Sequence, residues 1–236
     1  MNLVGFVKFV KVNMEKYKRI YIFAGHYGSG KTNIAVNMAV KIKSDGFNVN
    51  IADLDIVNPY FRTKDSATEL ENAGIKLVSP AFANTNVDLP ALPQEVYGIV
   101  QNKSVHAVLD VGGDDRGAYA LGRYVPYIKE ENDYEMCFVV NFYRPLTTTV
   151  EDAIEVMREI EVACNLKFTA IINNSNLGTE TTEQSIRQSV DKAKKLSEVT
   201  GLKILYTCVE QSLSENFTQE DVFPIKLQSK YFDIKE

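Results

Sequence analysis

The sequence predicts an α/β protein in which a mostly parallel central sheet is covered by helices on both faces. Short apolar runs alternate with segments whose apolar residues recur at helical spacing, and this alternation is typical of strand–helix–strand units. The short runs are apolar at successive positions, as expected of strands buried between two layers of helices. A length of 236 residues with 45% hydrophobic residues is enough for one such core.

The elements follow in order along the chain. The apolar run at 19–24 predicts the first strand, and a helix is expected over 31–43 from Ile34, Ala35, Met38, Ala39 and Ile42. Further strands are expected at 48–55, 75–80, 105–111, 135–144, 168–174 and 203–209. Further helices are expected at 64–73, 91–102, 117–131 with a break near Pro126, 150–164 and 180–199.

One domain spanning 1–236 is expected, because no linker, repeat or low-complexity segment divides the chain. Residues 1–13 are apolar but contain Lys8 and Lys11 and are too short to span a bilayer. We interpret them as a small extension or edge strand, with an interfacial anchor as the alternative. The last residues, 223–236, are short and carry acids, so a membrane-binding helix is not predicted there either.

Composition disfavours several classes of function. A net charge of −5 disfavours nucleic acid binding, although a local basic patch in an assembled dimer stays open. The only histidines, His26 and His106, disfavour a His-rich zinc site. Three widely spaced cysteines are typical of reduced, buried thiols, so we expect a cytoplasmic protein.

A glycine-rich segment lies between the first predicted strand and the first predicted helix. Residues 25–32, GHYGSGKT, fit the Walker A pattern G-x-x-x-x-G-K-[ST]. Glycines let successive N–H groups approach phosphate oxygens, and the helix N-terminus adds positive charge. Lys31 is expected to reach the β- and γ-phosphates and Thr32 to ligand Mg²⁺. The predicted nucleotide-binding residues are Gly25, His26, Tyr27, Gly28, Ser29, Gly30, Lys31, Thr32 and Asn33.

Acidic residues end two of the other predicted strands. Asp110 ends one strand and fits the Walker B role, while Asp53 and Asp55 end another. Ligands of open parallel sheets bind at the carboxyl ends of strands, and Mg²⁺ keeps waters that nearby acids orient. Of Asp53 and Asp55, we expect only one to face the nucleotide directly. Gly113 completes a D-x-x-G segment whose glycine N–H can sense a γ-phosphate.

This layout resembles the MinD/ParA and nitrogenase-iron-protein branch of P-loop ATPases, the SIMIBI class, over residues 18–210. The segment GHYGSGKTNIAVNMA resembles that branch's deviant Walker A motif and first helix. ADLD resembles its switch I, LDVGGDD its switch II, and IINNS the strand end that supplies an adenine-contacting Asn. The resemblance implies a three-layer P-loop NTPase sandwich.

The resemblance also implies roles for individual residues. Asp55 matches the acid that positions the attacking water, Asp53 would support the Mg²⁺ shell, and Asp110 the Walker B role. The catalytic residues would be Lys31, Asp55 and Asp110, and the metal ligands Thr32, Asp53 and Asp110. Asn174 matches the adenine contact, with Asn173 as the weaker alternative. ATP is expected rather than GTP, because residues 173–176 read NNSN where GTPases carry N-K-x-D.

Two departures from this branch bear on function. Members of this branch have a second lysine in the Walker A motif, which reaches across a dimer to the nucleotide of the other subunit. Here His26 occupies that position, so the resemblance does not imply that the other subunit activates hydrolysis. The iron protein's cluster cysteine has no counterpart, since Gly117 lies near that position. No Fe–S cluster is therefore expected.

The function expected first is a Mg-ATP-dependent ATPase switch that cycles between ATP and ADP, forms a homodimer and acts on an unknown protein partner. An alternative is an ATP-dependent synthetase or phosphotransferase resembling dethiobiotin synthetase and the cobyrinate amidating enzymes CobQ and CobB. Arg62 and residues 80–93 could then line a substrate site. A third hypothesis is a regulatory module that binds the nucleotide but hydrolyses it at a negligible rate.

Overall fold

The computed structural model describes residues 16–55, 66–79, 94–218 and 221–228. Its strands form an eight-stranded sheet in the order β3-β2-β4-β1-β5-β6-β7-β8, and every neighbouring pair is parallel. The strands are β1 Ile20–Ala24, β2 Val49–Asp53, β3 Lys76–Val78, β4 His106–Asp110, β5 Tyr134–Val140, β6 Ala170–Asn173, β7 Lys203–Glu210 and β8 Val222–Ile225. The sheet confirms the predicted parallel α/β architecture.

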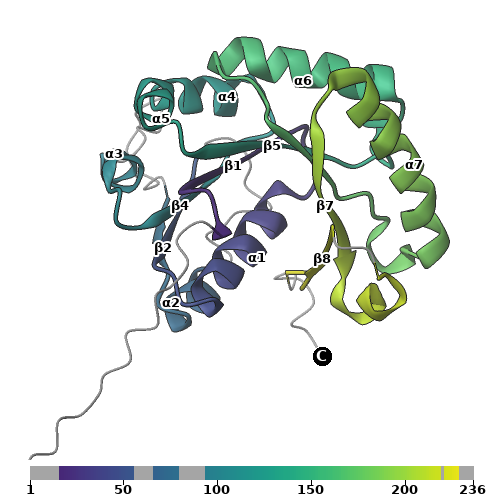
Figure 1. Ribbon diagram of the computed structural model, residues 1–236, viewed down its shortest axis with the longest axis horizontal. Coiled ribbons are helices and arrows are strands. Elements are labelled where there is room, and N and C mark those ends of the chain that lie inside the picture. Colours follow the sequence, from purple (N-terminus) through teal and green to yellow (C-terminus); the bar gives the residue numbers. More distant parts are fainter. Residues whose placement is uncertain (1–15, 56–65, 80–93, 219–220, 229–236) are drawn as a thin grey trace, which may run out of the picture.

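Helices cover the sheet on both faces (Figure 1). They are α1 Lys31–Ser44, α2 Ala67–Asn72, α3 Glu95–Gln101, α4 Asp115–Gly122, α5 Val125–Glu131, α6 Val150–Cys164 and α7 Glu183–Thr200. Short 3-10 turns lie at η3 Pro145–Thr147, η4 Gly178–Glu180 and η5 Gln211–Asn216. The three-layer arrangement predicted from the alternation of apolar segments is confirmed.

Two apolar clusters account for these layers. One joins the sheet to α1 and α2, and the other joins its opposite face to α3 through α7. Successive residues of β1 alternate between them: Ile22 belongs to the second cluster, whereas Tyr21 and Phe23 belong to the first. Side chains alternate across a strand, so a strand that is apolar at every position is buried on both faces.

Among the differences from the sequence predictions are the end of β5 and an additional strand, β8. β5 ends at Val140, earlier than predicted, because the Asn141 side-chain oxygen accepts the Tyr143 amide at 3.0 Å and turns the chain. The helix predicted over 117–131 divides as expected, with Pro126 in the first turn of α5. The strand β8 was not predicted. It contains Pro224 and forms the edge of the sheet, where a missing N–H is tolerated.

None of the helices in the described part of the chain is long and apolar enough to cross a membrane. The predicted extension at 1–13 lies outside the described residues, as do Arg62 and segment 80–93.

Candidate nucleotide-binding site

The glycine-rich loop joins the carboxyl end of β1, at the centre of the sheet, to the start of α1. Gly30 adopts a left-handed conformation, with φ 89°, immediately before the helix. A Cβ atom at this position would lie 2.2 Å from the side-chain nitrogen of Asn174. Only glycine satisfies both constraints. The strand–loop–helix context that the Walker A pattern requires is therefore present.

Lys31 is the first residue of α1 and is buried, with 7% of its surface exposed. Its Nζ donates to the carbonyl oxygen of His26 at 3.1 Å, so the side chain folds back along the loop. Burial lowers the pKa of Lys31, and the carboxylates of Asp110, Asp55 and Asp114 oppose that shift. The charge of the lysine is thus influenced by Asp110 at the end of β4 and by Asp55, two residues beyond β2.

The predicted acids gather at one edge of the sheet. Asp110 lies in register with Phe23 of β1 on one side and with Asp53 of β2 on the other. The Asp53 carboxylate accepts the amide of Asp55 at 2.9 Å. All three acids are buried. The carboxyl ends of adjacent strands therefore bring to the loop the acidic groups that a phosphate-bound Mg²⁺ requires.

The D-x-x-G glycine packs directly against the loop. A Cβ atom at Gly113 would lie 2.7 Å from the backbone nitrogen of Tyr27, 2.8 Å from its Cα and 3.0 Å from Lys31 Nζ. Contacts this short with backbone atoms cannot be relieved by rotating a side chain. The segment after β4 is therefore in contact with the part of the loop before Gly28.

The two asparagines at the end of β6 have different environments. Asn174 is 3% exposed, and its side-chain nitrogen donates to the carbonyl oxygen of Ser29 at 2.7 Å. Asn173 donates instead to Ser189 of α7 at 2.9 Å and accepts from the Ser175 hydroxyl at 2.7 Å. Asn174 is thus the residue beside the loop, and its predicted contact with adenine stays a prediction.

The remaining predicted loop residues lie around the same turn. Thr32 and Asn33 are partly exposed in the first turn of α1, and the side-chain oxygen of Asn33 accepts the Gln228 amide at 3.1 Å. Tyr27 is 51% exposed, and His26 Nδ1 lies 3.1 Å from the Tyr27 carbonyl oxygen.

These residues fit a magnesium–nucleotide complex. The Ser29 hydroxyl is buried and has no hydrogen-bond partner among the described residues, as expected of a loop shaped for a further ligand. In the same part of the chain, no three His, Cys, Asp or Glu side chains form a metal-binding group by themselves. If Mg²⁺ binds here, Thr32 would hold it directly and Asp53 and Asp110 would hold it through waters.

Two features at this site were not predicted from the sequence. The first is Arg144, whose Nε donates to the carbonyl oxygen of Gly28 at 3.1 Å across 116 positions of sequence. The second is residues 226–228, which we call the C-terminal strap. A local pattern could reveal neither, because each depends on where a distant segment returns to the loop.

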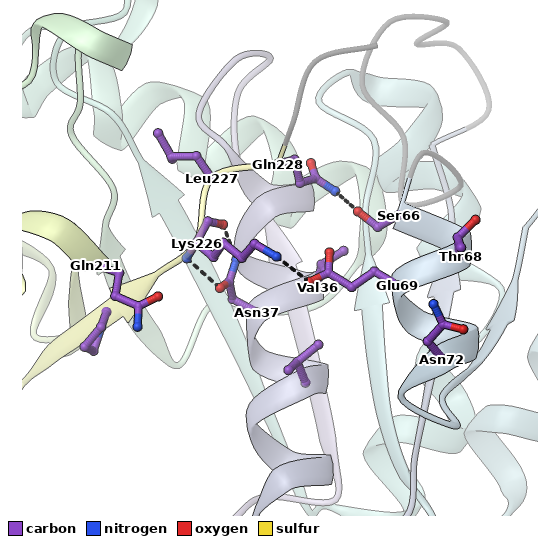
Figure 2. Close-up of a pocket in the computed structure, with 12 residues that line it drawn as sticks. Val36, Asn37, Ser66, Thr68, Glu69, Asn72, Gln211, Lys226, Leu227 and Gln228 are labelled. Atoms are coloured by element: carbon purple, nitrogen blue, oxygen red, sulfur yellow. Dashed lines mark hydrogen bonds and ion pairs between the residues drawn. The ribbon is translucent and has the colours of Figure 1, made fainter. Parts of the chain in front are cut away.

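The strap connects α1 with α2 beside a cavity of about 690 Å³ (Figure 2). Asn37 of α1 donates to the carbonyl oxygen of Lys226 and accepts its amide, both at 2.9 Å. On the α2 side, Lys226 Nζ pairs with Glu69 at 3.3 Å, and the Gln228 side chain donates to the Ser66 hydroxyl (Figure 2). The helix that begins at Lys31 is thereby tied to the segment that follows residues 56–65.

Comparisons with known proteins bear on the fold. No protein-family model and no curated protein matches the sequence. Among solved structures, the chain is similar to the cell division protein FtsY from Thermotoga maritima, with a TM-score of 0.53, 19% identity, and coverage of 80% of this chain and 61% of that one. Chloroplast FtsY from Physcomitrella patens gives a TM-score of 0.53, 16% identity and coverage of 80% and 57%.

A third similar structure is the signal recognition particle receptor FtsY from Elizabethkingia anophelis in complex with GDP. Its TM-score is 0.50 at 16% identity, with coverage of 84% of this chain and 59% of that one. The chain thus spans about three fifths of the length of these proteins. At such identities the matches show the α/β P-loop fold, as predicted. The closer resemblance to the MinD/ParA branch stays a prediction.

Proposed function

We propose that this chain binds Mg-ATP in the loop at 25–32, hydrolyses it to ADP, and thereby acts as a nucleotide-dependent switch on a protein partner. One observation carries the proposal. The buried Lys31 begins α1 directly after the glycine-rich loop, its Nζ donates to the His26 carbonyl oxygen at 3.1 Å, and the carboxylates of Asp110 and Asp55 raise its pKa against the effect of burial. A buried cation beside fixed acids is suited to holding phosphate and a divalent cation together.

The chain's own groups have separable roles in this proposal. Lys31 and the backbone N–H groups of the loop bind phosphate oxygens and stabilise the charge that develops on them. Asp55 orients the attacking water, and Asp53 and Asp110 hold the shell of the metal. The Mg²⁺, when bound, neutralises phosphate charge.

ATP is proposed over GTP on the residues that follow β6. Asn176 stands where the guanine-binding motif would place a carboxylate, and its side-chain nitrogen donates to the Asn174 carbonyl oxygen at 3.0 Å. Its side-chain oxygen accepts the Gly178 amide at 3.2 Å. This amide side chain therefore has local backbone partners and lacks the two carboxylate oxygens that a guanine edge would need.

The switch function rests on the contact between Gly113 and the loop, because a group bound beside Tyr27 and Lys31 has to displace or reorder that segment. The strap supplies a second connection from α1 to α2. The output is proposed to be a changed contact with a protein partner, formed by a homodimer of the chain.

Single-turnover hydrolysis of radiolabelled ATP tests the proposal. Asp55→Asn should lower the rate by about 10²–10³-fold with ATP affinity retained, because it removes the group that orients water. Asp191→Asn, an exposed carboxylate on α7, is the matched control and should leave the rate unchanged. If wild-type protein with Mg²⁺ neither binds nor hydrolyses ATP, the proposal fails. If a small metabolite accelerates ADP release many-fold and no protein does, the hypothesis of an ATP-dependent synthetase replaces that of a nucleotide-dependent switch.

A further inference from the structure

Arg144 is held on a well-tethered turn at the carboxyl end of β5, the strand beside β1. The fully buried Asn141 accepts the Arg144 amide at 3.1 Å and the Thr147 hydroxyl at 2.6 Å, both on its backbone oxygen. Its side-chain nitrogen donates to the carbonyl oxygen of Asn176 at 3.2 Å. Buried polar groups therefore fix where the backbone of Arg144 lies.

The guanidinium of Arg144 packs against the middle of the phosphate loop. Its Nε donates to Gly28 O at 3.1 Å. Gly28 has φ 75°, and a Cβ atom there would lie 3.4 Å from Arg144 Nε and 3.7 Å from both Cδ and Cζ. Because Gly28 has no side chain, the arginine can pack directly against the backbone of the loop. This contact uses one of the five guanidinium N–H groups.

The other donors of Arg144 have no hydrogen-bond or ion-pair partner within the described ranges of the chain, and the residue is exposed. A guanidinium stays protonated at any relevant pH and matches phosphate oxygens in a two-point geometry. Lys31, by contrast, is buried, and the carboxylates of Asp110, Asp55 and Asp114 act on its charge. Arg144 is therefore a cation at the outer rim of the loop whose charge no described carboxylate neutralises.

The position along the loop indicates which phosphate Arg144 would meet. Lys31, the first residue of α1, is expected to reach the β- and γ-phosphates. Gly28 directly follows Tyr27, whose backbone lies close to Gly113. We therefore expect this part of the loop to face the terminal phosphate, because Gly113 is the glycine expected to sense it.

We propose that Arg144 binds the terminal phosphate of the nucleoside triphosphate and supplies positive charge to it during hydrolysis. The inference rests on the proposed function and adds a catalytic residue to it. During hydrolysis the water oxygen bonds to the γ-phosphorus and the bond to the bridging oxygen breaks. The electron pair of that bond stays on ADP, and the water protons leave with inorganic phosphate and solvent. Arg144 stabilises the negative charge that grows on these oxygens.

The test compares the affinities of a non-hydrolysable ATP analogue and of ADP, both with Mg²⁺, in wild type and in Arg144→Ala. The analogue should lose roughly tenfold more affinity than ADP, because only the triphosphate has the group that Arg144 contacts. Single-turnover hydrolysis should fall by about 10²-fold or more, and Arg144→Lys should recover part of both losses. Arg158→Ala, an exposed arginine on α6, is the matched control and should change neither quantity.

A merely structural role would weaken ADP and the analogue equally, since the loop holds the inner phosphates of both. That result would overturn the inference, and so would an Arg144→Ala protein with wild-type affinities and rate. In either case, nucleotide binding by the wild type would leave the proposed function standing. If Arg144→Ala fails to unfold cooperatively, Arg144→Lys and Arg144→Gln carry the same comparison. Wild-type protein that binds neither nucleotide would refute both proposals.

Discussion

The side-chain nitrogen of Asn174 lies 2.7 Å from the carbonyl oxygen of Ser29, across 145 positions of sequence. This hydrogen bond joins the end of β6 to the phosphate loop after β1, although β5 separates the two strands in the sheet. The same nitrogen occupies the space that a side chain at Gly30 would fill. The conformation of the loop is thus stabilised by Asn174 as well as by the loop's own glycines.

Replacing Asn174 should weaken nucleotide binding beyond its effect on stability. Asn174→Ala removes the donor to Ser29 and leaves a buried carbonyl oxygen without this partner, which should lower the free energy of unfolding by about 1–3 kcal/mol. The freed loop should also bind Mg-ATP roughly tenfold more weakly. Asn173→Ala is the comparison, because it is equally buried but bonds to α7. It should lose stability and keep affinity within about threefold in the folded protein. Equal losses of affinity in both variants would refute this role of Asn174.

A methyl group at Gly113 should separate the segment after β4 from the loop. In Gly113→Ala the new atom would meet Tyr27 backbone atoms at 2.7 and 2.8 Å, so the segment has to move. We expect a loss of about 1–3 kcal/mol in unfolding free energy and a fall in hydrolysis of about 10²-fold. Gly98→Ala in α3 is the control, because a Cβ atom there has nothing within 4 Å. It should be neutral or slightly stabilising. Normal hydrolysis by Gly113→Ala would contradict the assigned contact.

Lys31 should make stability depend on pH in the alkaline range. Burial lowers its pKa below the ordinary 10.5, and the nearby carboxylates oppose this only in part. Between the lowered pKa and 10.5 the unfolded chain binds more protons, so this residue's contribution to the free energy of unfolding rises with pH. Denaturant unfolding of wild type and Lys31→Met from neutral pH to about pH 10.5 measures the difference. As the pH rises, the free energy of unfolding of the wild type should increase relative to that of Lys31→Met. A constant difference between the two proteins would contradict the prediction.

The C-terminal strap should contribute measurably to stability through Asn37. Asn37→Ala removes two hydrogen bonds to the backbone of Lys226 and should lower the free energy of unfolding by about 1–2 kcal/mol. The Lys226 amide should then exchange with deuterium faster. Asn72→Ala is the matched control, because Asn72 lines the same cavity and its side chain makes no hydrogen bond to another described residue. If exchange at Lys226 is unchanged in Asn37→Ala, the strap is not held as described.

Much of the fold could be predicted because buried strands and amphipathic helices have distinct apolar spacings. The position of Asp110 at a strand end followed from the run that precedes it. The strand β8 was not predicted because it is four residues long, contains Pro224 and lies at the edge of the sheet, so its composition resembles that of a loop.

Within the site, the contiguous loop could be predicted and the long-range contacts could not. The motif specifies local backbone geometry, so Gly30 and Lys31 lie where they were expected. The contacts of Arg144 with Gly28 and of Gln228 with Asn33 depend on the crossing of distant segments. A single sequence carries no local signal for such pairs.

Calorimetric titration of the full chain with Mg-ATP tests the central claim most directly. We predict one site per chain with a dissociation constant in the micromolar range, at least tenfold weaker in Lys31→Ala, and weaker binding of Mg-GTP than of Mg-ATP. Absence of binding, or equal affinity in wild type and Lys31→Ala, would show that the loop at 25–32 is not the nucleotide site.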